Sequence, residues 1–302
     1  MTAREAAPAP TPLTPAPRYG EIYDRGYRHY EGPRLGRRHA IWALVVYSMK
    51  RALGIKKGVG AKIIPILLYV GVALPVIISI GIRAFLPSAN VLDYAEFFGF
   101  IFVIEGIYVA TIAPEMLCGD RRENVLALYF SRAITRADYL LAKLVATALL
   151  TLTVSCIPAA ILWLGRQLLD DAPLQAMRDH LGDLGRIAVA GVMIAFFLGA
   201  IGLLVSSFTG RKSIAVAIIV VAFLIAEALA GALTFALRDS ESRFARYVLF
   251  LSPSSTISGL VGRLFHKTTL GIELPLWLIL AEMAAVIVVA CGVMYLRYVP
   301  NE

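Results

Sequence analysis

The sequence predicts an all-α membrane protein with six transmembrane helices, and two observations support this fold class. Of the 302 residues, 59% are hydrophobic and 17% are charged, with a mean hydropathy of +0.74, whereas soluble domains contain roughly 45–50% apolar and about 25% charged residues. The chain also contains six apolar runs of about 20 residues, the length that a helix needs to cross a bilayer. Because lipid offers the backbone no hydrogen-bond partner, each crossing segment must be helical.

The residues before the first apolar run are expected to lie outside the hydrocarbon core. Residues 1–19 are rich in Pro and Ala and should form a disordered cytoplasmic tail. Residues 20–62 should form a cytoplasmic or interfacial connecting region that contains an amphipathic helix. In residues 40–62, a short apolar stretch with Trp42 and Tyr47 is followed by several basic residues, which suit anionic headgroups. This helix either lies in the membrane plane or packs on its neighbour in the cytosol.

The six predicted spans form a transmembrane domain over residues 63–302. Their ranges are 63–82, 97–118, 144–165, 187–208, 213–237 and 274–296. Basic residues accumulate on the cytoplasmic side of short loops, and 20 of the 29 Lys and Arg residues lie in segments 1–62, 119–143 and 211–212 and at Arg297. We therefore expect both termini to be cytoplasmic.

The loop between the second and third predicted spans has an unusual pattern. Its residues 119–134 combine a short apolar helical face with surrounding charges, which is typical of a helix that docks into a groove of another protein. A solvated hairpin loop is the alternative. The predicted docking residues are Asp120, Arg121, Arg122, Glu123, Val125, Leu126, Leu128, Tyr129 and Arg132. Thr135 and Asp138, three residues apart, predict a capping box that begins the third spanning helix.

The loop of residues 238–273 on the other side is fairly apolar in its second half but is interrupted at Ser252 and Pro253. We expect a broken, partly re-entrant or interfacial element there, with short outer helices between the fifth and sixth spans. A seventh crossing is the less favoured alternative, because it would place the C-terminus outside.

Three carboxylates lie inside predicted spans, where charged groups face a bundle interior or a wet cavity. Glu105, Glu227 and Glu282 fall within a few ångströms of one depth at about 1.5 Å per residue. No Lys or Arg shares that depth, so these groups are protonated, hydrogen-bonded to hydroxyls, or part of a polar passage. They are candidates for a substrate path, and packing between helices is the alternative.

Other classes of chemistry lack their motifs in this sequence. The four histidines form no His-Glu-x-x-His pair, so no metal site is expected. The Gly-x-x-x-x-Gly-Lys-Ser/Thr phosphate-binding loop is missing, so we expect this chain to bind no ATP, and no other cofactor, by itself. Topology explains most of the net charge of +8, so nucleic acid is not an expected partner. No catalytic residue is predicted.

The segment from Pro114 to Lys143 resembles the loop after the second span in permeases of the ABC-type-2 superfamily, the type V exporters. This superfamily includes drug, antibiotic, lipid and polysaccharide exporters. Asn124 stands where Gly is usual and Ala133 where Pro is usual. The matching residues are Glu115, Asp120, Arg121, Arg122, Ile134, Thr135, Arg136, Tyr139 and Lys143.

The resemblance implies the membrane subunit of an ATP-driven exporter in a bacterial plasma membrane, with residues 119–134 as the coupling helix. A separate ABC subunit would bind ATP and Mg²⁺, a second permease subunit would complete a homodimer or heterodimer, and membrane lipid would surround both. A secondary transporter and a non-transporting scaffold or sensor are the alternatives that the residues themselves leave open.

Overall fold

The computed structural model describes residue 32 and residues 35–55, 58–86, 91–130, 134–237, 248–267 and 274–298, apart from the side chains of residues 61, 127 and 128. The chain divides into two units, residues 1–34 and 35–302, and the fold described below is that of the second unit. The predicted tail of residues 1–19 lies outside the described residues. Every regular element in the described ranges is helical.

The six predicted spans are confirmed by six helices that are long and apolar enough to cross a membrane. At about 1.5 Å per residue, even the shortest of them, with 23 residues, is about 35 Å long and exceeds the roughly 30 Å hydrocarbon core. The helices are α2 (Gly60–Phe85), α3 (Tyr94–Arg122), α5 (Arg136–Leu168), α7 (Leu181–Ser207), α8 (Lys212–Ala236) and α11 (Leu276–Tyr298).

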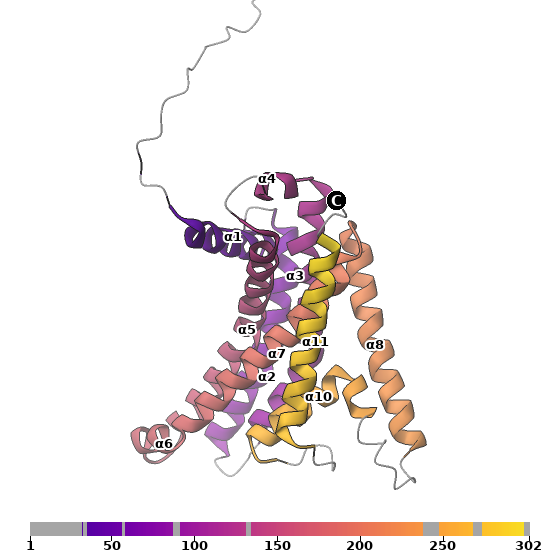
Figure 1. Cartoon of the computed structure of the whole chain (residues 1–302). Coiled ribbons are helices and arrows are strands. Elements are labelled where there is room, and N and C mark those ends of the chain that lie inside the picture. The colour runs from indigo at the N-terminus through magenta and orange to yellow at the C-terminus, as the bar shows by residue number, and fades with distance from the viewer. Residues whose placement is uncertain are drawn as a thin grey trace, which may run out of the picture. The chain divides into compact units, whose positions relative to one another are not determined.

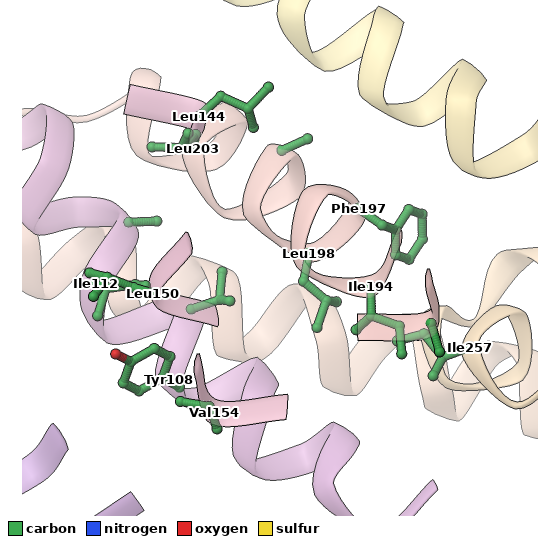
Figure 2. Packing of buried hydrophobic residues seen from close by; sticks show 14 of the residues in the cluster. Tyr108, Ile112, Leu144, Leu150, Val154, Ile194, Phe197, Leu198, Leu203 and Ile257 are labelled. Atoms are coloured by element: carbon green, nitrogen blue, oxygen red, sulfur yellow. The ribbon is translucent and has the colours of Figure 1, made fainter. Parts of the chain in front are cut away.

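The core lies where α7 packs against α3 and α5. Figure 2 shows Tyr108 of α3, Leu150 of α5 and Leu198 of α7 pointing into this shared interior, and each is at most 2% exposed. The helices α8 and α11 are much less buried than this core. In each of them, only 17% of the most apolar 18-residue stretch is buried. Most of the apolar surface of these two helices is therefore left uncovered by the described part of the chain.

One end of the bundle carries α1 (Arg37–Ala52), α4 (Leu126–Phe130) and the last turn of α11 (Figure 1). A helix, α1, therefore lies within residues 20–62, the range of the predicted connecting region. α1 runs across the bundle end and packs on α5 and α3 through a face that includes Leu44, Val45 and Ser48. Trp42 and Tyr47 are exposed, and the interfacial position of α1 stays a prediction.

The opposite end carries α6 (Pro173–Asp179), and the short helices η1 (Val248–Leu251) and α10 (Pro253–Leu264) come between α8 and α11 in the chain (Figure 1). The break predicted around Pro253 is where α10 begins. The Ser252 hydroxyl caps α10 by accepting a hydrogen bond from the Ser255 backbone N–H at 3.3 Å, and Pro253 occupies the first helical position, where its missing N–H costs nothing. The rest of the predicted broken loop, residues 238–247 and 268–273, lies outside the described residues.

Candidate functional site

The predicted docking segment begins inside a spanning helix. Residues 119–122 are the last turn of α3, so the expected helix of residues 119–134 is divided into the end of α3, a turn, and α4. In the turn, the Asn124 N–H bonds to the Arg121 carbonyl at 3.3 Å and the Val125 N–H to the Asp120 carbonyl at 3.2 Å. This pair of bonds is a Schellman motif, which ends a helix by reversing the chain through one left-handed residue.

That left-handed residue is Asn124, with φ of 52°. Asn tolerates this conformation better than other residues with a side chain, because its short polar group can bond locally, and Gly adopts it freely. The replacement of the usual Gly by Asn at this position therefore preserves the turn. The other departure from the family pattern, Ala133, lies outside the described residues.

The turn makes a specific prediction about position 124. Asn124→Gly should leave stability nearly unchanged, whereas Asn124→Ala should lower the free energy of unfolding by about 1 kcal/mol, because a Cβ without a compensating polar group is strained at positive φ. The midpoint of thermal unfolding in detergent measures the difference. Equal midpoints for the two variants would contradict this description of the turn.

Asp120 is at the centre of a buried ionic cluster that joins three helices. Its Oδ1 accepts from Nη1 of Arg51 in α1 at 2.6 Å, and its Oδ2 lies 2.7 Å from Nζ of Lys143 in α5. The Tyr139 hydroxyl donates to Oδ2 at 2.9 Å, and Lys143 also donates to the Ser48 hydroxyl at 3.0 Å. The side chains of Asp120 and Lys143 are 0% and 1% exposed. Asp120 is therefore an internal tie between helices and has no free surface to offer to a partner.

Gly119 gives Arg51 access to this cluster. A Cβ at position 119 would lie only 1.9 Å from the Arg51 Nη2 atom, so the guanidinium crosses α3 where the helix has no side chain. Arg51 also pairs with Glu123, Nη2 to Oε1, at 3.2 Å. The sequence placed Arg51 among basic residues that suit lipid headgroups, but its side chain is only 12% exposed and points to Asp120.

The start of α5 is fixed in the predicted way. Thr135 and Asp138 form the expected capping box, with hydrogen bonds of 3.2 Å from the Asp138 N–H to the Thr135 hydroxyl and 2.9 Å from the Thr135 N–H to the Asp138 carboxylate. Arg37 of α1 also donates a bidentate pair of hydrogen bonds, from Nε and Nη2, to the Asp138 carboxylate oxygens, each at 2.8 Å. The connecting helix α1 thus contacts the end of α3 and the start of α5.

The apolar face of the segment packs partly on the chain itself. The ring centroids of Tyr129 and Phe130 both lie 5.9 Å from that of Tyr139, and Leu126 also packs against the core. Burial, with a smaller contribution from Asp120, raises the pKa of Tyr129 to about 12, so this hydroxyl stays protonated. The interior of the chain therefore uses part of the face that was expected to meet a partner.

The outward charges of the predicted site are fewer than the sequence suggested. Arg122 and Glu123 have side chains 66% and 48% exposed. Arg121, in contrast, donates to the Ser207 carbonyl and lies 6.0 Å from the Tyr298 ring centroid, so it joins α3 to the ends of α7 and α11. Val125 is partly buried, and Leu128 and Arg132 lie outside the side chains that the structure describes.

The three mid-span carboxylates all meet hydroxyl groups, which was one of the alternatives. Glu105 is fully buried and accepts a hydrogen bond from Ser155 of α5. Glu227 of α8 accepts from the hydroxyls of Ser252 and Ser254 at 2.7 and 2.6 Å and from the Ser254 N–H at 3.1 Å. It therefore anchors the first turn of α10, where a carboxylate also complements the helix dipole.

Glu282 of α11 lies against the same short helix, near Thr256, and its Oε2 has no hydrogen-bond partner among the described residues. The structure thus brings Glu227 and Glu282 together around α10, whereas Glu105 belongs to the α3–α5 contact. Nowhere in the described ranges do three or more His, Cys, Asp or Glu side chains lie close enough to hold a metal ion.

Sequence reasoning missed Ser48 and Ser207 as parts of the site. Neither belongs to a recognisable pattern, because each acts through one atom on a residue about 90 positions away. Lys143 was noted only through its resemblance to the family pattern, and its pairing with Asp120 had no local signal.

A comparison with protein-family models identifies the chain over residues 51–293 as an ABC-2 family transporter protein. A comparison with curated proteins finds no match. The matched range includes all six spans except residues 294–298 of α11, together with the Asp120 cluster and α10. The chain therefore belongs to the ABC-2 transporter family and is a membrane component of an ABC transporter.

Proposed function

We propose that this chain is the permease subunit of an ATP-driven exporter and that its ATP-binding subunit docks on the turn and α4, residues 122–130. The family implies association with an ABC ATP-binding subunit. The observation that carries the position of the contact is that Arg122 and Glu123 are exposed directly beside the buried Asp120 cluster. A force applied to this turn acts on a cluster that is fixed to both α5 and α1.

The Asp120 cluster suggests how motion passes into the membrane. When two ATP-binding subunits close on nucleotide, they move the turn, and the ion pairs of Asp120 make α5 and α1 follow the end of α3 as one body. α5 packs along α7, so the displacement reaches the middle of the bundle. ATP and Mg²⁺ are bound by the partner and not by this chain.

The family and the exposed apolar surfaces of α8 and α11 support a dimer that is surrounded by lipid. A second permease subunit, identical or related, pairs with this one, and lipid covers the remaining surface of α8 and α11, which is largely unburied. The substrate belongs to the lipid, drug, antibiotic or glycan-like classes. The complex lies in a bacterial plasma membrane with both termini in the cytoplasm. Family membership favours this function over a secondary transporter or a scaffold.

The docking proposal predicts a local effect at Arg122. Arg122→Glu should reduce the amount of ATP-binding subunit that co-purifies with the chain about tenfold, because it reverses an exposed charge at the contact. Arg38→Glu, an exposed change on α1 away from the turn, is the matched control and should have little effect. Thermal unfolding of both variants should match the wild type. Equal co-purification of the two variants would disprove docking at this turn.

Among the three mid-span carboxylates, Glu282 is the one that we propose for the substrate path. Glu105 is sealed between helices and Glu227 is used by α10, whereas Glu282 is partly exposed. Glu105 and Glu282 each have one buried carboxylate oxygen without a partner among the described residues. Glu282→Gln should abolish the stimulation of ATPase activity by a substrate from a panel of lipids, drugs and glycans. Glu105→Gln should lower thermal stability but leave the stimulation intact. If Glu282→Gln retains full stimulation, Glu282 is not part of the path.

A further inference from the structure

A polar cavity of about 280 Å³ lies at the end of the bundle that carries α6. Its walls come from the ends of α2, α3, α5, α7 and α10. Binding pockets for small ligands begin at about 300 Å³, so the cavity has room for a small polar group. Its charged lining residues are Arg83, Asp93, Arg166, Asp170, Asp183 and Arg186.

Contacts within the protein neutralise two of the three carboxylates in this cavity. Asp93, the N-cap of α3, receives Arg166 at 3.2 Å and also Lys267. Asp183 is 2.8 Å from Arg186 and 3.2 Å from His180. These pairs form the walls of the cavity, and both carboxylates are already occupied by cations of the protein.

One cation and one anion are left over. Arg83 forms no hydrogen bond or ion pair with any residue that the structure describes. Asp170 accepts a hydrogen bond from the Ala172 N–H at 3.4 Å. It forms no ion pair with any Lys, Arg or His side chain that the structure describes. A ligand that carries only an anion would leave Asp170 uncompensated, and a ligand that carries only a cation would leave Arg83 uncompensated. A ligand with both charges satisfies the site.

We expect the cavity to lie at the level of the membrane interface. Arg83 and Arg166 are each the third residue from the end of a spanning helix, α2 and α5. The apolar side chains of Phe85 and Leu168 in the same turns are 88% and 56% exposed. Polar side chains at span ends with exposed apolar neighbours suit the boundary between headgroups and acyl chains.

We propose that this cavity binds a zwitterion that carries a phosphate and an ammonium group, the chemistry of a phosphatidylethanolamine headgroup. Arg83 binds the phosphate through its guanidinium fork, and Asp170 accepts hydrogen bonds from the ammonium group. Phe85 and Leu168 offer an apolar surface to the acyl chains. The site is independent of the docking and transport functions proposed above.

The test uses the full-length chain in nanodiscs with equal amounts of phosphatidylethanolamine and phosphatidylglycerol, and measures the retained lipid by native mass spectrometry. The wild type should retain phosphatidylethanolamine preferentially. Arg83→Gln should lower the retention of both lipids about tenfold, and Asp170→Asn should lower only that of phosphatidylethanolamine, by a similar factor. Arg178→Gln and Asp179→Asn are matched controls, because both residues are exposed on α6 and lie outside the cavity lining.

Soluble probes distinguish a lipid from a free zwitterion. If phosphoethanolamine binds to the delipidated chain in a manner that needs Arg83 and Asp170, and phosphatidylethanolamine is not retained, the chemistry holds and the ligand is a free molecule. The proposal is overturned if the wild type retains both lipids equally, if inorganic phosphate competes as well as phosphoethanolamine, or if the control variants lose as much lipid as the cavity variants.

Discussion

Asp120→Asn should lower the free energy of unfolding by about 3–5 kcal/mol, the usual cost of removing one partner from a buried ion pair. The loss leaves Lys143, whose side chain is 1% exposed, with the Ser48 hydroxyl but without a counter-charge. It also removes the 2.6 Å ion pair of Arg51 and so weakens the connection between α1 and the end of α3, where the exposed pair with Glu123 remains. Thermal unfolding of the purified chain in detergent measures the effect.

Glu123→Gln is the matched control for this prediction, because Glu123 binds the same Arg51 at 3.2 Å but is 48% exposed. An exposed pair contributes at most about 1 kcal/mol, so the control should lie close to the wild type. Adding Lys143→Met to Asp120→Asn should restore part of the stability, since it removes the orphaned charge. If Asp120→Asn unfolds at the same temperature as Glu123→Gln, the cluster does not join the helices.

The features that sequence predicted correctly are those with a local cause. Hydropathy over 20 residues is enough to find a spanning helix, and the spacing of Thr135 and Asp138 is enough to find a cap. The interruption at Pro253 is a property of one residue type. In each case the physical cause lies within a few residues of the feature, so no knowledge of the rest of the fold is needed.

The predictions that changed depended on contacts between distant segments. Asp120 looks like a surface residue in sequence because Arg121, Arg122 and Glu123 follow it. Its direction is decided by Arg51, 69 positions earlier, and by Lys143 on the next span. The hydroxyls that meet Glu227 are likewise about 25 residues away, on α10. Hydropathy gives the depth of a carboxylate in the membrane but not the side chain that faces it.

Sequence also does not show which distant side chain lies against a glycine, and Gly202 provides a direct test of such a contact. Gly202→Ala should lower the free energy of unfolding by about 2 kcal/mol, within the usual range for overfilling a packed core. The new Cβ would lie 2.4 Å from Val109 Cγ1 and 3.1 Å from Ala113 Cβ. Val109 is fully buried and its side chain is short, so it has no space to move into. α7 would therefore separate from α3 along the central contact of the bundle.

Gly231→Ala is the matched control, because it makes the same chemical change inside another spanning helix. A Cβ at position 231 meets no atom within 4 Å, so the variant should gain about 0.5–1 kcal/mol from the better helix propensity of Ala. Hydropathy changes equally at the two positions, and the difference between them reports packing alone. Opposite signs in thermal unfolding would support close contact between α7 and α3, and equal signs would disprove it.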